Sequence, residues 1–147
     1  MPDTKSAAIK AKSREDVLKA LEAAQQELGH TPRSLMTELA AATGLSTAEV
    51  YGVASFYSFI SVKPTGRHVI RICNSLPCHI KDADKVVEAI RKASCAGPCE
   101  TSGDRRFTLQ LVNCIRACDG SPAMLVDDDT HTNLKPESIT EILSRYK

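Results

Sequence analysis

The chain has 147 residues, 42% of them hydrophobic and 25% charged, which is the composition of a soluble globular protein and excludes wholesale disorder. Lys and Arg number 19 and Asp and Glu 18, so the large basic excess of a nucleic-acid-binding protein is missing. The sequence has no apolar run of about 18 residues that would span a membrane, and residues 1–14 lack the apolar segment of a secretory signal. We therefore expect a cytoplasmic protein with no nucleic-acid partner and no direct membrane insertion.

Residues 1–62 predict an N-terminal three-helix bundle, because apolar residues recur every three or four positions between turn and capping signals. The expected helices begin and end at recognisable signals: a Ser13–Asp16 capping box with a stop at Gly29, an N-cap at Thr31 with a stop at Gly44, and a Ser46–Glu49 capping box with an end near Phe59.

The third of these helices is unusually aromatic. Four of the six aromatic residues of the chain lie within nine positions, namely Tyr51, Phe56, Tyr57 and Phe59. A helix that is apolar on two sides is either buried all round or meets a partner. We expect residues 13–60 to dock onto a partner protein, with packing against the C-terminal half as the alternative.

Residues 63–147 change to the alternating pattern of strands, and predict a β-α-β-β-β-α domain, so the fold class is α+β. The turn at 63–66 leads into this part. The expected strands cover residues 67–73, 107–114, 123–126 and 131–134, and the expected helices cover residues 82–93 and the segment that begins at Pro136.

Four of the six cysteines form two pairs, each at the end of a predicted strand. Cys78 follows Cys73 after four residues, and Cys118 follows Cys114 after three. The 35 residues between Cys78 and Cys114 can hold a crossover connection. Adjacent strands lie about 5 Å apart, so neighbouring strands would bring four thiolates together. Four thiolates suit zinc or an iron–sulfur cluster. The loose spacing favours a [2Fe–2S] cluster, with zinc, a disulfide or free thiols as open alternatives.

The same cysteine spacing, together with other segments, resembles the thioredoxin-like [2Fe–2S] ferredoxin family. This family includes the 24-kDa-type subunit of respiratory complex I and small subunits of NAD-dependent hydrogenases and formate dehydrogenases. The resemblance covers nearly the whole chain, and its further matches are residues 45–59, Cys78-His79, residues 107–109, residues 122–124 and Asn133-Leu134. It implies a thioredoxin-like C-terminal domain and assigns the cluster ligands to Cys73, Cys78, Cys114 and Cys118.

The sequence departs from the family pattern in the ligand loops. The first loop lacks the Gly-Thr that relatives often carry, and the second has Ile115-Arg116 where Leu-Gly is common, followed by Asp119 where glycine is usual. A cation such as Arg116 would raise the reduction potential of a nearby cluster, and Asp119 would oppose it.

Two further cysteines, Cys95 and Cys99, lie outside the matched pattern. These two cysteines have three possible roles: they form a redox disulfide, they bind an extra metal, or they are free thiols in a variable loop. His79, next to a ligand, can donate a hydrogen bond to the site or simply face solvent.

The resemblance implies an electron-transfer subunit that is itself non-catalytic. The chain has no G-x-G-x-x-G or G-x-x-x-x-G-K fingerprint, so we expect FMN and NAD(H) on a partner flavoprotein subunit within an oxidoreductase complex. In some family members the complex is a hydrogenase or formate dehydrogenase that bifurcates electrons, and in others it is an NADH dehydrogenase.

The alternative function is an iron–sulfur transcriptional regulator. Residues 39–46, with the helix that follows them, resemble the helix-turn-helix of DNA-binding proteins. Against it, the would-be recognition helix has no Arg or Lys before Lys63, and base readout needs polar side chains.

Overall fold

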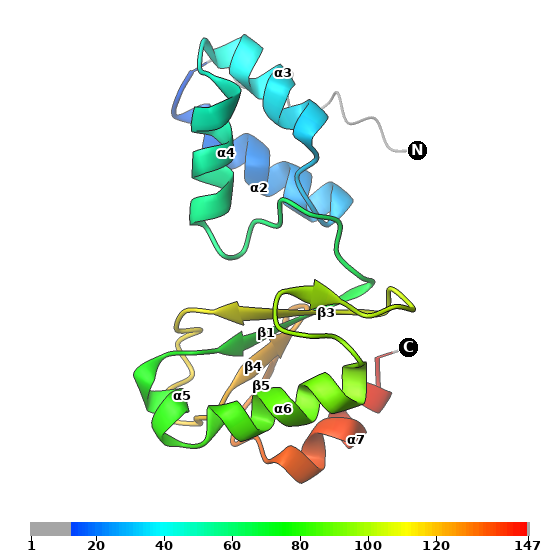
Figure 1. Cartoon of the computed structure of the whole chain (residues 1–147). Helices are drawn as coiled ribbons and strands as arrows, with labels where there is room; N and C mark the ends of the chain where they lie inside the picture. The colour runs from blue at the N-terminus through cyan, green and yellow to red at the C-terminus, as the bar shows by residue number, and fades with distance from the viewer. Residues whose placement is uncertain (1–12, 147) are drawn as a thin grey trace. The chain divides into compact units, whose positions relative to one another are not determined.

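The computed structural model describes residues 13–146, which divide into two compact units between Pro64 and Thr65 (Figure 1). Within residues 13–64, unit 1 contains three helices: α2 (Asp16–Leu28), α3 (Arg33–Thr43) and α4 (Thr47–Phe56). Unit 2 contains a sheet of five strands with three α-helices and one short 3₁₀ helix. None of the helices between residues 13 and 146 has the length and apolar character needed to cross a bilayer.

The first two helices of unit 1 end where the sequence predicts, but the starts of the helices and the end of the third differ in part. Gly29 and Gly44 follow α2 and α3 with φ of 72° and 69°, a conformation that glycine adopts without a Cβ penalty. The Ser46–Glu49 capping box at the start of α4 is confirmed. The predicted N-cap at Thr31 is wrong, because Pro32 occupies that position and Thr31 is buried.

Two further differences concern the ends of the predicted helices. Ser13 donates from its N–H and its hydroxyl to the carboxylate of Asp16, yet α2 itself begins only at Asp16. Helix α4 ends at Phe56 rather than near Phe59, because Tyr57 is extended, with φ −91° and ψ 114°. Phe59 therefore lies outside the helix.

A single hydrophobic core holds the helices of unit 1 together. Helices α2 and α3 each contribute four buried residues, whereas α4 contributes only Val50 and Ala54. Most of α4, including its aromatic side chains, thus lies outside this core. The buried residues are Val17, Ala20, Leu21, Ala24, Leu35, Met36, Leu39, Ala40, Val50, Ala54 and Ile60.

The sheet of unit 2 has the order β2-β3-β1-β4-β5. Its central strand, β1, pairs in parallel with β3 and antiparallel with β4. The other pairs are antiparallel. The strand bounds are β1 (His68–Cys73), β2 (Glu100–Thr101), β3 (Phe107–Val112), β4 (Met124–Val126) and β5 (Asp129–His131).

The predicted β-α-β-β-β-α order needs two corrections. A short strand, β2, lies in the segment expected to be a loop, and a short helix, α5 (Leu76–Ile80), which contains Cys78, lies between β1 and α6. The last strand begins directly after a two-residue turn, at Asp129 rather than near His131, because the side chain and N–H of Asp127 bond back to β1 at Val69.

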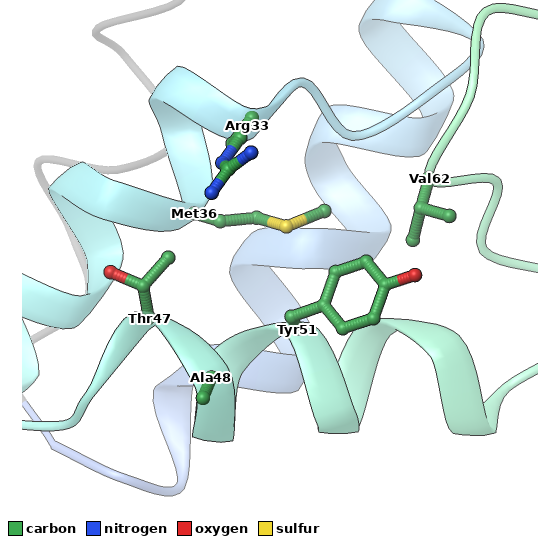
Figure 2. Close-up of a pocket in the computed structure, with 6 residues that line it drawn as sticks. All are labelled: Arg33, Met36, Thr47, Ala48, Tyr51 and Val62. Atoms are coloured by element: carbon green, nitrogen blue, oxygen red, sulfur yellow. The ribbon is translucent and has the colours of Figure 1, made fainter.

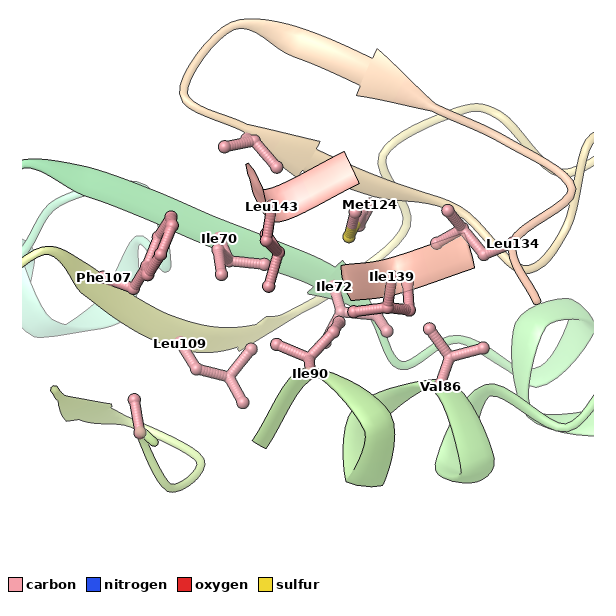
Figure 3. Close-up of a cluster of buried hydrophobic side chains, with 12 residues drawn as sticks. Ile70, Ile72, Val86, Ile90, Phe107, Leu109, Met124, Leu134, Ile139 and Leu143 are labelled. Carbon is pink, nitrogen blue, oxygen red and sulfur yellow. The ribbon is translucent and has the colours of Figure 1, made fainter. Parts of the chain in front are cut away.

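Helices α6 (Ala83–Ser94) and α7 (Ile139–Ser144) cover one face of the sheet, with a 3₁₀ turn at Pro136–Ser138 before α7 (Figure 1). Their apolar side chains meet those of the strands in the main core of the unit (Figure 3). This core contains Ile70, Ile72, Val86, Ile90, Ala96, Phe107, Leu109, Met124, Val126, Leu134, Ile139 and Leu143.

The parallel β1–β3 pair is what places the candidate site. A parallel pair needs a crossover connection, and the chain from α5 to β2 supplies it. In the register of this pair, Cys73 lies opposite Val112, so both strands end at the same edge of the sheet. The segments that follow β1 and β3, which lead into α5 and into the loop of Cys114 and Cys118, therefore leave the sheet at the same end.

Candidate metal centre

The first cysteine pair is buried. Cys73 is the last residue of β1, and Cys78 lies in α5; both pack with Ala83 in a small cluster that Ile115 also contacts. The loop between them is held to the sheet, because the N–H of Cys73 donates to the carbonyl of Ala123 and the N–H of Asn74 donates to that of Val112. The two sulfurs thus lie in a fixed, largely water-excluded place.

The second pair is exposed. Cys114 and Cys118 lie in the loop that follows β3, with their sulfurs 3.3 Å apart. This separation is far longer than a disulfide bond of about 2.05 Å. Two thiolates on one tetrahedral metal, with bonds of about 2.3 Å, are about 3.8 Å apart. The spacing of Cys114 and Cys118 is therefore close to that of two ligands on one metal.

The charges of the other three predicted site residues act on Cys118. A hydrogen bond with Cys114 raises the pKa of Cys118, and burial and the charges of Cys114, Cys73 and Cys78 raise it further. Like charges in one place disfavour the ionised form of each group. A bound cation would relieve this repulsion, since thiolates are the form that binds metal.

The pKa values of the two buried thiols are shifted in opposite directions. Burial raises the pKa of the Cys73 thiol, but hydrogen bonds from Ser75, Cys78 and the N–H of Ile115 outweigh it and bring the pKa below its ordinary value. Burial raises the pKa of Cys78, and hydrogen bonds from Ser121 and the N–H of Ala123 oppose it only in part. Cys73 is thus the thiol of this pair that ionises first.

The arrangement is two pairs rather than one compact group. Within residues 13–146, no three His, Cys, Asp or Glu side chains are grouped as a site for a single metal ion. A [2Fe–2S] rhomb needs two thiolates at each of its two irons. Two pairs of cysteines, one on β1 and α5 and the other in the loop after β3, provide such ends, so the residues present fit this group.

The second ligand loop keeps a glycine-like backbone without glycine. Arg116 has a φ of 67°, in the left-handed region that disfavours side chains with a Cβ. In this conformation its N–H donates to the sulfur of Cys114 at 3.4 Å. The departure from Leu-Gly at this place in the loop therefore introduces backbone strain, while the loop still offers its N–H to a sulfur.

Sequence reasoning missed the groups that support the sulfurs. Ser75, Ser121, Ile115 and Ala123 all contribute hydrogen bonds to the buried pair. Every residue except proline has a backbone N–H, so the residue types of Ile115 and Ala123 do not indicate that they donate to a sulfur. The serines flank ligand positions, which is the one feature that could have identified them.

The other candidate residues, Cys95, Cys99 and His79, are exposed. Cys95 follows α6 and Cys99 precedes β2; both are exposed, with φ of 54° and 61°. His79 is exposed, with its Nδ1 3.2 Å from the carboxylate of Asp84. His131 contacts the hydroxyl of Tyr146 through Nε2 at 2.9 Å.

Comparison with known sequences decides the family. The profile of the thioredoxin-like [2Fe–2S] ferredoxins matches residues 4–147, nearly the whole chain. The chain belongs to this family. Its parallel β1–β3 pair, the cysteine loops at one sheet edge and the covering helices are thus the thioredoxin-like fold of an iron–sulfur protein, and the resemblance in the sequence is confirmed.

Two related sequences are named as subunits of NADH-quinone oxidoreductases. The chain is 42% identical over 130 residues to a subunit of the NADH-quinone oxidoreductase of Escherichia coli K12, covering 88% of this chain and 78% of the relative. It is 38% identical over 129 residues to the corresponding NADH-quinone oxidoreductase subunit of Pseudomonas aeruginosa, with the same coverage.

Solved structures share the fold over most of the chain. The NAD⁺-reducing [NiFe]-hydrogenase matches in its H₂-reduced state with a TM-score of 0.74 at 21% identity, over 92% of this chain. The air-oxidised state matches with a TM-score of 0.71 at 23% identity, over 88% of this chain. In both states the match spans 22% of the hydrogenase chain, so this chain corresponds to about a fifth of that polypeptide.

Proposed function

We propose that the chain is the [2Fe–2S] electron-transfer subunit of an NAD(H)-dependent oxidoreductase complex. The observation that carries this proposal is the gathering of Cys73, Cys78, Cys114 and Cys118 at one sheet edge, which we assign as the four cluster ligands. Membership of the ferredoxin family and 42% identity to an NADH-quinone oxidoreductase subunit support it. Bound here, the cluster would accept and return one electron at a time.

The residues of the chain perform supporting tasks at this centre. Burial of Cys73 and Cys78 excludes water from one end, and the N–H groups of Ile115 and Arg116 each donate to a sulfur. Hydrogen bonds to cluster sulfurs stabilise the more negative reduced state and raise the potential. The exposed side at Cys114 leaves an approach for electrons from another protein.

The donor in this proposal is a flavoprotein subunit that carries FMN and the NAD(H) site, while this chain is non-catalytic. Relatives named as oxidoreductase subunits support an assembly of several subunits, which we place in the cytoplasm. We further assign residues 1–62 as a helical bundle that docks onto the complex, and residues 63–147 as the electron-transfer domain.

The helical unit has a surface suited to docking, which we call the α4 face: Tyr51, Phe56 and Tyr57 with the grooves beside them. Phe56 is 80% exposed and Tyr51 51% exposed. A groove of about 480 Å³ between α3 and α4 is lined by Met36 and Tyr51 among others (Figure 2). A second groove of about 530 Å³ lies on the other side of α4, along α2 and Phe56. Exposed aromatic side chains of this kind are typical anchors of interfaces.

The decisive experiment is the metal content of the anaerobically purified chain with matched cysteine variants. We expect a brown protein with about two irons and two sulfides, and an EPR signal on one-electron reduction. Cys73→Ser or Cys114→Ser should abolish or distort the spectrum, whereas the Cys95→Ser/Cys99→Ser double variant should keep it. A colourless protein with one zinc would refute the proposal, and loss of the cluster in the double variant would refute the ligand assignment.

A further inference from the structure

Residues 121–123, which directly precede β4, contact the buried cysteine pair. Ser121 and Ala123 are themselves buried, at 4% and 1% exposure. The hydroxyl of Ser121 and the N–H of Ala123 are hydrogen-bonded to the sulfur of Cys78. The carbonyl of Ala123 accepts from the N–H of Cys73. This segment lies outside both cysteine loops, yet it contacts both members of the buried pair.

Ser121 is also hydrogen-bonded to the loop of the exposed cysteine pair. Its hydroxyl donates to the carbonyl of Cys118 at 2.5 Å, and its N–H donates to the same carbonyl at 3.3 Å. One side chain thus connects a sulfur of the buried pair with the backbone of the exposed pair. A serine hydroxyl has a single proton to donate, so the carbonyl of Cys118 and the sulfur of Cys78 compete for it.

The ionised sulfur is the better acceptor for this proton. Cysteine binds metal as the thiolate, so Cys78 in the loaded site has no proton of its own and only accepts. Hydrogen bonds to ionised groups are shorter and stronger than those to neutral carbonyls, and a place without water strengthens them further. The carbonyl of Cys118 keeps the N–H of Ser121 as its donor when the hydroxyl turns to the sulfur, so this carbonyl does not lose its last partner.

We propose that Ser121 is a positioning residue of the metal centre, whose buried hydroxyl donates to the sulfur of Cys78 and raises the reduction potential. This inference rests on the proposed function. The reduced centre carries one more negative charge than the oxidised centre, so a donor at one of its sulfurs stabilises the reduced form more. Because Ser121 is buried, water and salt screen this bond less than they screen an exposed cation such as Arg116.

Redox titration of the cluster-loaded full chain, followed by EPR, tests this with Ser121→Ala. At a fixed ambient potential, we expect the ratio of reduced to oxidised cluster to fall about tenfold, which is about 59 mV for one electron. Ser121→Thr keeps the hydroxyl and should stay within about twofold of the wild type. As a matched control, Ser94→Ala removes another buried hydroxyl, which donates to the carbonyl of Ile90. Ser94 ends α6, whereas Ala83, which packs with the buried cysteines, begins it, so this variant should leave the ratio unchanged.

A vibrational measurement separates this hydrogen bond from a packing role. The hydroxyl proton exchanges in D₂O, so the Fe–S(Cys) stretching bands of the resonance Raman spectrum should shift between H₂O and D₂O more in the wild type than in Ser121→Ala.

Other results would overturn the inference. An unchanged ratio in Ser121→Ala with an intact cluster would show that the hydroxyl does not act on the sulfur, while the proposed function would stand. An equal fall in Ser121→Ala and Ser121→Thr, with the same isotope shift as the wild type, would assign the effect to packing. If Ser121→Ala does not hold the cluster, the absence of any isotope shift in the wild type would overturn the inference. Absence of a cluster in the wild type would instead refute the proposed function.

Discussion

Replacing Arg116 by glycine should stabilise unit 2, although it lies beside the metal centre. A side chain held at φ 67° costs roughly 1–2 kcal/mol relative to glycine. Glycine lowers the free energy of unfolding by about 0.5–1 kcal/mol, because it has more conformational freedom in the unfolded chain. The net gain is about 0.5–1 kcal/mol. For a unit of this size that raises the unfolding midpoint by about 4 °C, which differential scanning calorimetry of the metal-free chain would measure.

Arg105 offers a matched control for this substitution. It is also exposed and has a φ of 56°, but it lies in the turn before β3. Arg105→Gly should therefore raise the midpoint by a similar amount. The reasoning about strain fails if Arg116→Gly lowers the midpoint while Arg105→Gly raises it, because the Arg116 side chain would then make stabilising contacts that outweigh its backbone cost.

The same pair of variants separates charge from backbone in the reduction potential. Removing a cation disfavours the more negative reduced state, so the potential should fall in Arg116→Gly. For an exposed charge about 10 Å away in water, the interaction is about 0.4 kcal/mol, which corresponds to about 20 mV. The N–H of residue 116 remains to donate to Cys114, so no larger change is expected. Redox titration followed by EPR measures this, and Arg105→Gly should leave the potential unchanged.

Two further predictions concern other parts of the chain. Phe56→Gln on the α4 face should weaken binding to the complex about tenfold and leave the cluster spectrum and the folded helical content unchanged; circular dichroism that shows unfolding would instead make Phe56 a core residue. Burial and the hydrogen bond to Asp129 raise the pKa of Tyr146 to about 12. Because the ordinary value is about 10, the stability that this shift contributes is complete below pH 10 and is lost as the pH rises toward 12. Tyr146→Phe should therefore flatten the alkaline part of the stability curve measured with denaturant.

The sequence predicted the long helices and strands because these carry strong periodic patterns of apolar residues. The spacing of the cysteines indicated the two candidate ligand pairs. Strands β1 and β3 and helix α6 lie within a few residues of their predicted bounds. Helix α5 spans five residues and β2 only two, so neither is long enough for a period to be recognised. The alternating pattern over 107–114 predicted a strand that ends at Cys114, whereas β3 ends at Val112. Cys114 therefore lies in an exposed loop and not at the end of a strand.

The asymmetry of the site could not be predicted for a different reason. Cysteine spacing identifies four sulfurs but says nothing about which of them is covered, since that depends on packing between distant segments. Cys73 and Cys78 are covered by Ala83 and Ile115, whereas Cys114 and Cys118 face outward. The positive φ of Arg116 is likewise imposed by the loop, because its residue type favours the opposite conformation.

The cysteines form a small cluster of their own, separate from the main core of unit 2, and this has a consequence for the metal-free chain. The two pairs come from segments that the pairing of β1 with β3 brings to the same end of the sheet. Since the main core is built entirely from other residues, it can form in the newly made apoprotein. Loss of the metal centre should therefore leave the main core of unit 2 intact, with the exposed pair, Cys114 and Cys118, as the open side of the site.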